Sequence, residues 1–396
     1  MRWRRSQPPR SRQPEPPAQE HGRLWKLRHP CRRRKRPGPP PDLPPPFQPP
    51  MQQQAAPRLP IGPPHEHTAR QVWSRPQQTA QIFGGTHIPQ LVVGAPSPSI
   101  EPSAISDTYR SFPFQPDTVT DGWSTDTMTL RGTSQRGHLH RAYGVPRQDD
   151  FTMHDLPDGR VIISVADGVS QAQQAHLGAH HATRLATNWL RLNLSDNIAD
   201  TDWMNLIRST AWALNERAQR LFGLAEPDPI RTEIEFATTL ICAVVEPIAP
   251  GALRAHLVGC GDSAAWILSD GRFTNLVGGK AESLSGITSS EVVGLPRVPR
   301  EVAAVSVEIG PNDVLLIGSD GVGDPLGSGE GGVGNLLREA LCRPSPPSLI
   351  EFAHAVGFSR ETFDDDRTLV AVWPRQPWSD RSDPPLPQPA QGNNVP

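Results

Sequence analysis

The sequence has few cysteines and no long apolar run. Its four cysteines, Cys31, Cys242, Cys260 and Cys342, show none of the paired spacings of a zinc site or a disulfide framework. No stretch approaches the roughly 20 consecutive apolar residues that a membrane-spanning helix needs. No apolar core follows the basic N-terminus, as a secretion signal would require. These absences predict a cytoplasmic protein with reduced thiols and no membrane span.

The sequence also lacks a strong net charge. A formal charge of −2 gives no overall electrostatic attraction to nucleic acid or membrane. Residues 1–65 are the exception, because they combine the arginine clusters "RWRR" and "CRRRKR" with dense proline. Such a segment buries too little apolar surface to offset an ordering cost of about 1–2 kcal/mol per residue. We therefore expect a disordered Arg/Pro-rich tail over 1–65, a linker over 66–127 that is partly ordered at most, and a disordered Pro-rich tail over 376–396. Contact of the basic tail with nucleic acid or an acidic surface is expected only as a secondary role.

Regular secondary structure is expected in residues 128–375. Apolar runs rich in β-branched residues predict strands over 161–166, 238–245, 253–258, 264–268, 302–309, 314–318 and 368–373. Helical spacing predicts helices over 171–194, 202–224, 334–342 and 347–358, with Ser170 and Asp202 capping the first two. Residues 280–299 have no periodicity and predict a loop or flap. Two long helices followed by a meander of strands indicate an α+β fold.

Two of the expected strands lead directly into an aspartate and a glycine. "VADGVS" ends in Asp167-Gly168, and "VLLIGSDGVGD" contains Asp320-Gly321. The Asp-Gly pairs of "LPDGRV" and "LSDGRF" fit ordinary hairpin turns. An apolar run that ends in aspartate instead places the carboxylate at the end of a core strand, where it is partly desolvated. A glycine after it lets the backbone approach closely, because no Cβ intervenes.

Further carboxylates share this position at expected strand ends. They are Asp149 and Asp150 in "RQDDF", Asp262 in "GCGDS", and three consecutive aspartates in "FDDDRT". Each like-charged pair at ~4 Å costs about 4 kcal/mol at an effective dielectric constant near 20. Either the carboxylates lie apart as turn residues, or a cation gathers them. Oxygen ligands without histidine or cysteine favour Mg²⁺ or Mn²⁺, and a pair of such ions activates water for attack on phosphate.

The order Gln-Asp, Ala-Asp-Gly, Gly-Asp-Ser, Ser-Asp-Gly and Asp-Asp-x-Thr resembles the metal-dependent serine/threonine protein phosphatases of type 2C. The lead-in "RGHLHRAYGVPRQDDF" resembles a divergent bacterial branch of that family. The resemblance covers residues 128–373. It implies a four-layer α-β-β-α sandwich of two mainly antiparallel sheets, with a metal cleft at the strand ends. It also implies hydrolysis of phosphoserine and phosphothreonine in proteins, by water activated by two Mn²⁺ or Mg²⁺ ions with an optional third.

The same resemblance implies a set of site residues. Asp149 corresponds to the first metal ligand, or Asp150 if the motif is shifted by one residue. Asp167 corresponds to the carboxylate that bridges both ions, with the Gly168 carbonyl as a further ligand. Asp320 and Asp365 correspond to ligands of the second ion. Asp262 lies near the position of the third ion, where Asp324 could assist.

The sequence departs from the family at several of these places. Val169 stands where animal enzymes have a histidine proposed as general acid, so proton donation falls to water or to a histidine of the next helix: His176, His180 or His181. The arginine expected to bind phosphate is displaced, and Arg141 or Arg147 could replace it. Asp366 stands where asparagine is usual, and Ala264 replaces an arginine. These departures leave open a catalytically inactive relative that binds or regulates phosphoproteins.

Overall fold

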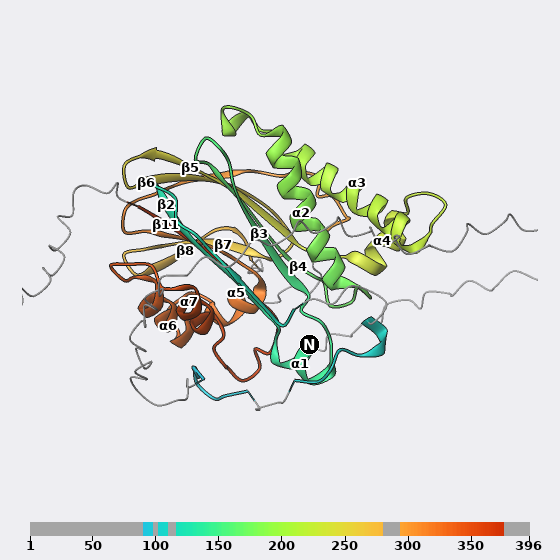
Figure 1. Cartoon of the computed structure of the whole chain (residues 1–396), viewed down its shortest axis with the longest axis horizontal. Coiled ribbons are helices and arrows are strands. Elements are labelled where there is room, and N and C mark those ends of the chain that lie inside the picture. The colour runs from blue at the N-terminus through green and yellow to red at the C-terminus, as the bar shows by residue number, and fades with distance from the viewer. Residues whose placement is uncertain (1–89, 98–101, 110–115, 280–293, 376–396) are drawn as a thin grey trace, which may run out of the picture. The chain divides into compact units, whose positions relative to one another are not determined.

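The computed structural model describes residues 90–97, 102–109, 116–279 and 294–375, which belong to one compact unit, Ile82–Pro396. The predicted tails over 1–65 and 376–396, and most of the predicted loop over 280–299, lie outside these residues. Two antiparallel sheets pack face to face within the unit (Figure 1). The six-stranded sheet has the order β1 (Thr118–Asp121), β2 (Met128–Gln135), β11 (Arg367–Pro374), β10 (Val314–Gly318), β7 (Ala264–Ser269), β8 (Arg272–Gly278). The five-stranded sheet has the order β3 (Asp149–Asp155), β4 (Val161–Asp167), β5 (Leu240–Ala249), β6 (Ala252–Cys260), β9 (Val305–Ile309).

Strand β4 shows why the central strands read as unbroken apolar runs. Successive side chains of a strand point to opposite faces of its sheet. Val161, Ile163 and Val165 therefore pack in the core between the two sheets. Ile162 and Ala166 pack on the other face against helices. Both faces of the strand are covered, so neither carries a polar stripe.

Helices cover the outer face of each sheet and complete a four-layer α-β-β-α arrangement (Figure 1). Helices α2 (Ala175–Asn193) and α3 (Trp203–Phe222) cover the five-stranded sheet. Helices α5 (Asp320–Leu326), α6 (Gly332–Leu341) and α7 (Leu349–Val356) cover the six-stranded sheet. The predicted α+β sandwich is thus confirmed. None of the helices in the described ranges combines the length and apolar character that crossing a bilayer requires.

The start of α2 differs from the prediction. Asp202 caps α3 as expected, since its side chain accepts a hydrogen bond from the Asn205 amide, but α2 begins at Ala175 and Ser170 is not its cap. The intervening residues run along the end of helix α4 (Pro229–Phe236). There Gln173 N donates to Ile234 O and Gln174 N donates to Glu235 O, both at 2.9 Å. These amides are satisfied by α4, so they need no helix of their own.

The prediction also omitted several elements: β1, β2, β3, β8, α4, α5 and the short helix α1 (His138–Tyr143). Their sequences carry weak signals for different reasons. Strand β1 is a half-exposed edge strand, and β2 interrupts its apolar residues with Arg131 and Gly132. Helix α1 has no buried residue to create an apolar stripe. Propensity and periodicity cannot reveal elements that tertiary contacts stabilise.

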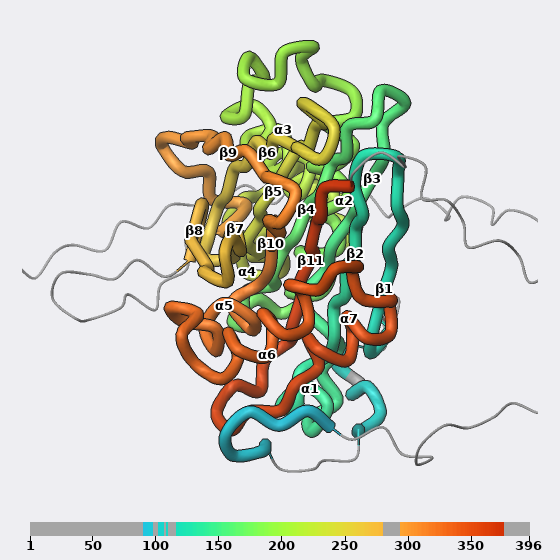
Figure 2. The backbone as a smooth tube through the Cα atoms, turned by 90° about the vertical axis from the view of Figure 1, so that its left-hand side faces the viewer, coloured from blue at the N-terminus to red at the C-terminus, as the bar shows by residue number. Residues whose placement is uncertain are grey.

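Residues 90–97 and 102–109, predicted as part of a linker, pack on the domain, and we call them the N-terminal strap. Val93 N donates to Ser359 O at 2.9 Å, and Ser359 N donates to Leu91 O at 2.7 Å. Leu91 and Val93 pack against the apolar cluster beneath α6 and α7. Further along, Ser106 N donates to the carbonyl oxygen of Gly144, which ends α1. Figure 2 shows the strap, in blue, beside α1 and the segment that leads into β11.

We expect deletion of residues 1–109 to lower the free energy of unfolding by about 2 kcal/mol or more relative to deletion of residues 1–89, because the longer deletion removes the packed side chains of Leu91 and Val93. Urea unfolding of the two truncated proteins measures the difference. Equal stabilities would show that the strap adds nothing to the fold.

Candidate metal centre

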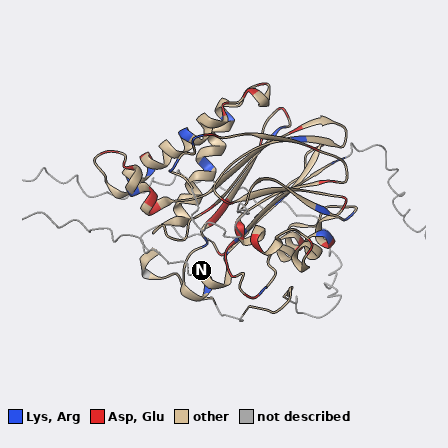
Figure 3. Ribbon diagram, turned by 180° about the vertical axis from the view of Figure 1, so that it is seen from behind, with Lys and Arg blue, Asp and Glu red and all other residues tan. Residues whose placement is uncertain are grey.

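The structure brings four predicted aspartates together at one end of the sheets. The β3–β4 register places Asp149 opposite Asp167. Asp320 begins α5 two residues after the end of β10, and Asp365 lies two residues before the start of β11. The charges of Asp149, Asp320 and Asp365 all act on Asp167, which also hydrogen-bonds Asp320. Figure 3 shows acidic segments converging where these strands end.

Burial and mutual repulsion dominate the electrostatics of this cluster. Burial, and then the charge of Asp366, raises the pKa of Asp149 to about 8, against a weaker opposing effect of its hydrogen bond from Ser319. The same two causes raise the pKa of Asp365 to about 6. Burial and three neighbouring carboxylates raise the pKa of Asp167 well above its ordinary value. An all-oxygen donor set that is unfavourable when ionised fits a hard divalent cation.

Residues next to these aspartates hydrogen-bond one another and so fix the cluster. Ser319 Oγ donates to Asp149 Oδ2 at 2.6 Å and accepts from Thr368 N at 3.1 Å. Gly168 N donates to Gln148 O at 3.2 Å. The two sheets are therefore joined by polar contacts at the site as well as by their apolar core.

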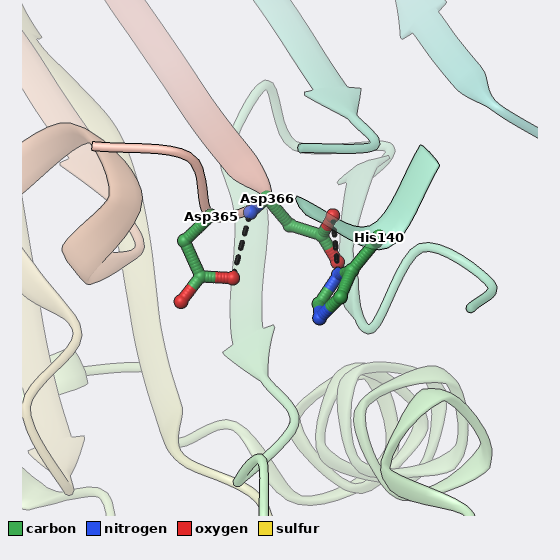
Figure 4. Close-up of side chains that lie close together, drawn as sticks. All are labelled: His140, Asp365 and Asp366. Atoms are coloured by element: carbon green, nitrogen blue, oxygen red, sulfur yellow. Dashed lines mark hydrogen bonds and ion pairs between the residues drawn. The ribbon is translucent and has the colours of Figure 1, made fainter. Parts of the chain in front are cut away.

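Asp366 lies at the centre of this network (Figure 4). Its Oδ1 accepts the Gly137 amide at 2.6 Å and lies 2.9 Å from His140 Nδ1, and its Oδ2 accepts the Gln148 amide. Burial alone would lower the pKa of His140, but the hydrogen bond with Asp366 and the nearby carboxylates raise it to about 8. One ligand atom each of His140, Asp365 and Asp366 lies within 4.8 Å of the others. The motif "RGHLH" contains His140, but the sequence alone indicated no role for this residue.

Glycine is required at two positions, because another segment of the backbone packs closely against each of them. A Cβ on Gly321 would lie 1.8 Å from the carbonyl oxygen of Asp366. A Cβ on Gly168 would lie 2.7 Å from the carbonyl oxygen of Ala175, at the start of α2. At both positions the space that glycine leaves is used by protein backbone.

Asp150 points away from the cluster. Its Oδ2 lies 2.8 Å from Arg184 Nη1 and 2.9 Å from His180 Nδ1. Burial would raise the pKa of Asp150, but His180 and the guanidinium groups of Arg147 and Arg184 lower it. Of the two consecutive aspartates, the structure therefore brings Asp149 to the other carboxylates and gives Asp150 a set of cationic partners.

Neither arginine predicted to bind phosphate is presented as expected. The Arg147 side chain is 1% exposed and donates to Pro116 O, Ser134 Oγ and Asp149 O, so it braces the interior and offers no surface to a phosphate. Arg141 donates from Nε and Nη2 to the two carboxylate oxygens of Asp117. The sequence could not show this, because Asp117 and Pro116 lie in the segment expected to be a linker.

The remaining predicted residues lie around the cluster. Asp262 precedes Ser263, whose Oγ lies 2.7 Å from Thr239 Oγ1, and Thr239 N donates to Asp167 O. Asp262 is thus beside the end of β4. His176 packs edge-on against Tyr109, and His181 against Phe236. His180 contacts Asp150 instead. None of these three histidines of α2 therefore contacts the four clustered aspartates.

Comparison with known proteins identifies the family. The family model "Protein phosphatase 2C" matches residues 136–348, more than half of the chain. The chain belongs to the protein phosphatase 2C family. This membership confirms the family and the enzyme class, a protein serine/threonine phosphatase, that were predicted from the motifs. A search of curated proteins found no match.

Several solved structures are similar to this phosphatase domain. RsbX in complex with magnesium is 12% identical, with a TM-score of 0.41, and the match covers 65% of this chain and 100% of RsbX. Stp1 from Staphylococcus aureus is 15% identical, with a TM-score of 0.43 and coverages of 62% and 94%. The catalytic domain of the serine/threonine protein phosphatase PstP with two manganese ions is 21% identical, with a TM-score of 0.41 and coverages of 63% and 99%.

In the presence of chelator, we expect Asp149→Asn to be more stable than the wild type, by a margin that grows with pH. The folded-state pKa of about 8 lies above the ordinary value of 3.8, so the stability contributed by the protonated carboxyl is lost as pH rises between them. The margin should grow by on the order of 1 kcal/mol per pH unit and level off above the folded-state pKa. Thermal unfolding with EDTA across this range measures it. A margin independent of pH would contradict the prediction, and Asp270→Asn, at an exposed turn, is the control.

We expect Gly321→Ala to lower the free energy of unfolding by about 1–3 kcal/mol or more, because the new methyl group would overlap the Asp366 carbonyl. Gly331→Ala is the matched control, since a Cβ there meets nothing within 4 Å. Urea unfolding compares the two variants. Similar stabilities would mean that the backbone beside Asp320 can shift to accommodate the methyl group at little cost in free energy.

Proposed function

We propose that this phosphatase domain hydrolyses phosphoserine and phosphothreonine esters in proteins, through water activated by two Mn²⁺ or Mg²⁺ ions, with a third ion optional. The convergence of Asp149, Asp167, Asp320 and Asp365 is the observation that carries the proposal. These carboxylates come from separate parts of the chain, and their mutual repulsion is unfavourable without a cation.

The proposed roles follow from the placement of each residue. Asp167, opposite Asp149 and beside Asp320, would bridge the two ions, and the Gly168 carbonyl would add a ligand. Asp320 and Asp365 would hold the second ion. Bound cations would neutralise the carboxylates, acidify a water molecule and stabilise charge on the phosphate oxygens during in-line attack.

Residues of the chain prepare this arrangement before a substrate binds. Ser319 donates to one oxygen of Asp149 and so orients the carboxylate. Asp149, Asp167 and Asp365, with their raised pKa values, would release protons as cations bind, so occupancy should increase with pH. The cluster would then provide negative ligands that match the charge of the ions.

The alternative function, an inactive regulatory or phosphoprotein-binding domain, is favoured by one observation. Arg147 is enclosed and Arg141 is paired with Asp117, so the predicted phosphate contact is not prepared in the described residues. Both functions imply a phosphorylated protein partner. We also propose a cytoplasmic location, because Cys242 is a buried free thiol.

We expect the full chain to hydrolyse p-nitrophenyl phosphate and a phosphothreonine peptide with Mn²⁺ or Mg²⁺, and to lose activity in chelator. Asp167→Asn and Asp320→Asn should each lower kcat/KM roughly 100-fold or more, since loss of even an outer partner of a metal ligand costs 10–100-fold. Asp270→Asn is the matched control: it alters an Asp-Gly turn outside the cluster, and asparagine tolerates the φ of 48° found there.

A folded wild-type protein that binds two ions but hydrolyses neither substrate would favour the inactive regulatory domain. Hydrolysis that persists in chelator would contradict the metal requirement itself.

A further inference from the structure

Asp366 has a buried carboxylate that the proposed ligand set does not use. It is 2% exposed and lies directly after Asp365. Its two oxygens are already engaged by the amides of Gly137 and Gln148 and by the His140 ring. Buried carboxylates are retained only where such partners compensate for lost hydration. Although His140, Asp365 and Asp366 are close enough to share a metal, these contacts favour a hydrogen-bonded brace.

The brace acts on the peptides that carry the ligands. Gln148 precedes Asp149, its amide donates to Asp366, and its carbonyl accepts the Gly168 amide. One carboxylate therefore links the chain at Asp149, at Asp365 and, through Gln148, at Asp167. A displacement of Asp366 would change the spacing between aspartates that belong to different sheets.

We propose that His140 and Asp366 form a positioning pair that sets the spacing of the metal-binding aspartates. This inference rests on the proposed function, because it assigns a role toward the same ions. His140 Nδ1 lies 2.9 Å from Asp366 Oδ1, and this close contact holds Asp366 in the orientation that reaches both amides. Neither residue of the pair needs to contact the substrate, so both act through the aspartates.

His140 is itself held in place from outside the cluster. A six-residue helix such as α1 is not stable alone, so its position depends on its contacts. The N-terminal strap supplies them: Ser103 N donates to Arg141 O, and Ser106 N donates to Gly144 O, both at 2.9 Å. Nδ1 of His140 is buried, whereas its side chain as a whole keeps 12% exposure. The nitrogen that faces Asp366 is therefore the enclosed one.

The test is a set of variants of the full chain, measured by calorimetric titration with Mn²⁺ and by kcat and KM with p-nitrophenyl phosphate and a phosphothreonine peptide. We expect His140→Ala and Asp366→Asn each to weaken Mn²⁺ binding about 10-fold, within the 10–100-fold range for outer partners of metal ligands. His140→Asn should retain most of the affinity, because its side-chain amide can replace Nδ1–H. His138→Asn, on the same helix, is the control.

The double variant His140→Ala/Asp366→Asn should bind Mn²⁺ about as well as either single variant, since paired residues are not additive. Additive losses, or unchanged affinity in His140→Ala, would overturn the positioning pair. So would a loss confined to kcat with the phosphothreonine peptide, whose leaving group is poorer, because it would indicate proton donation by His140. Failure of His140→Asn to restore affinity would also overturn it.

Measurements on the wild-type protein distinguish failure of the positioning pair from failure of the proposed function. Wild-type protein that binds two Mn²⁺ ions without hydrolysis would overturn the proposed function alone, since the comparison of affinities still tests the pair. Wild-type protein that binds no Mn²⁺ would overturn both.

Discussion

Repulsion among closely grouped carboxylates is the constraint on which this arrangement depends. Asp149, Asp167, Asp320 and Asp365 are each supplied by a different strand end, and their burial raises the pKa of three of them. Such a cluster disperses unless the surrounding chain is rigid. The rigidity comes from contacts between neighbours of the ligands: Ser319 with Asp149 and Thr368, and Asp366 with Gly137 and Gln148. The sandwich core holds the sheets together, and these polar contacts hold their ends in register.

The fold was predictable where side-chain pattern and burial agree. Strand β4 and helix α3 could be placed to within a few residues, because an unbroken apolar run and a capped amphipathic stripe leave few alternatives. The beginning of α2 could not be placed, because the amides that precede it donate hydrogen bonds to carbonyl oxygens of α4. Strands β1 and β2 and helix α1 depend on partners distant in sequence, which no local pattern encodes.

The grouping of aspartates was predictable as a set of residues but not as a geometry. Repetition of aspartate after an apolar run indicated Asp167 and Asp320, although this pattern alone left turn residues as an alternative. The choice between Asp149 and Asp150 depended on His180 and Arg184 of α2, which lie against the Asp150 carboxylate. The surroundings of Arg147 and the contact of His140 with Asp366 were likewise hidden, since each joins residues whose proximity only tertiary structure creates.

The contacts that complete the site span most of the domain. The Ser319–Asp149 contact joins residues 170 positions apart, that of Asp366 with Gly137 joins residues 229 apart, and that of Ser97 with Ser359 joins residues 262 apart. Contacts of such long sequence separation slow folding, because their formation carries a large loop-closure entropy cost. During synthesis, Asp365 and Asp366 leave the ribosome after nearly all of the domain, so a nascent chain lacks the carboxylates that close the site. The order of synthesis thus leaves the proposed cation site of the phosphatase incomplete until the last strand is in place.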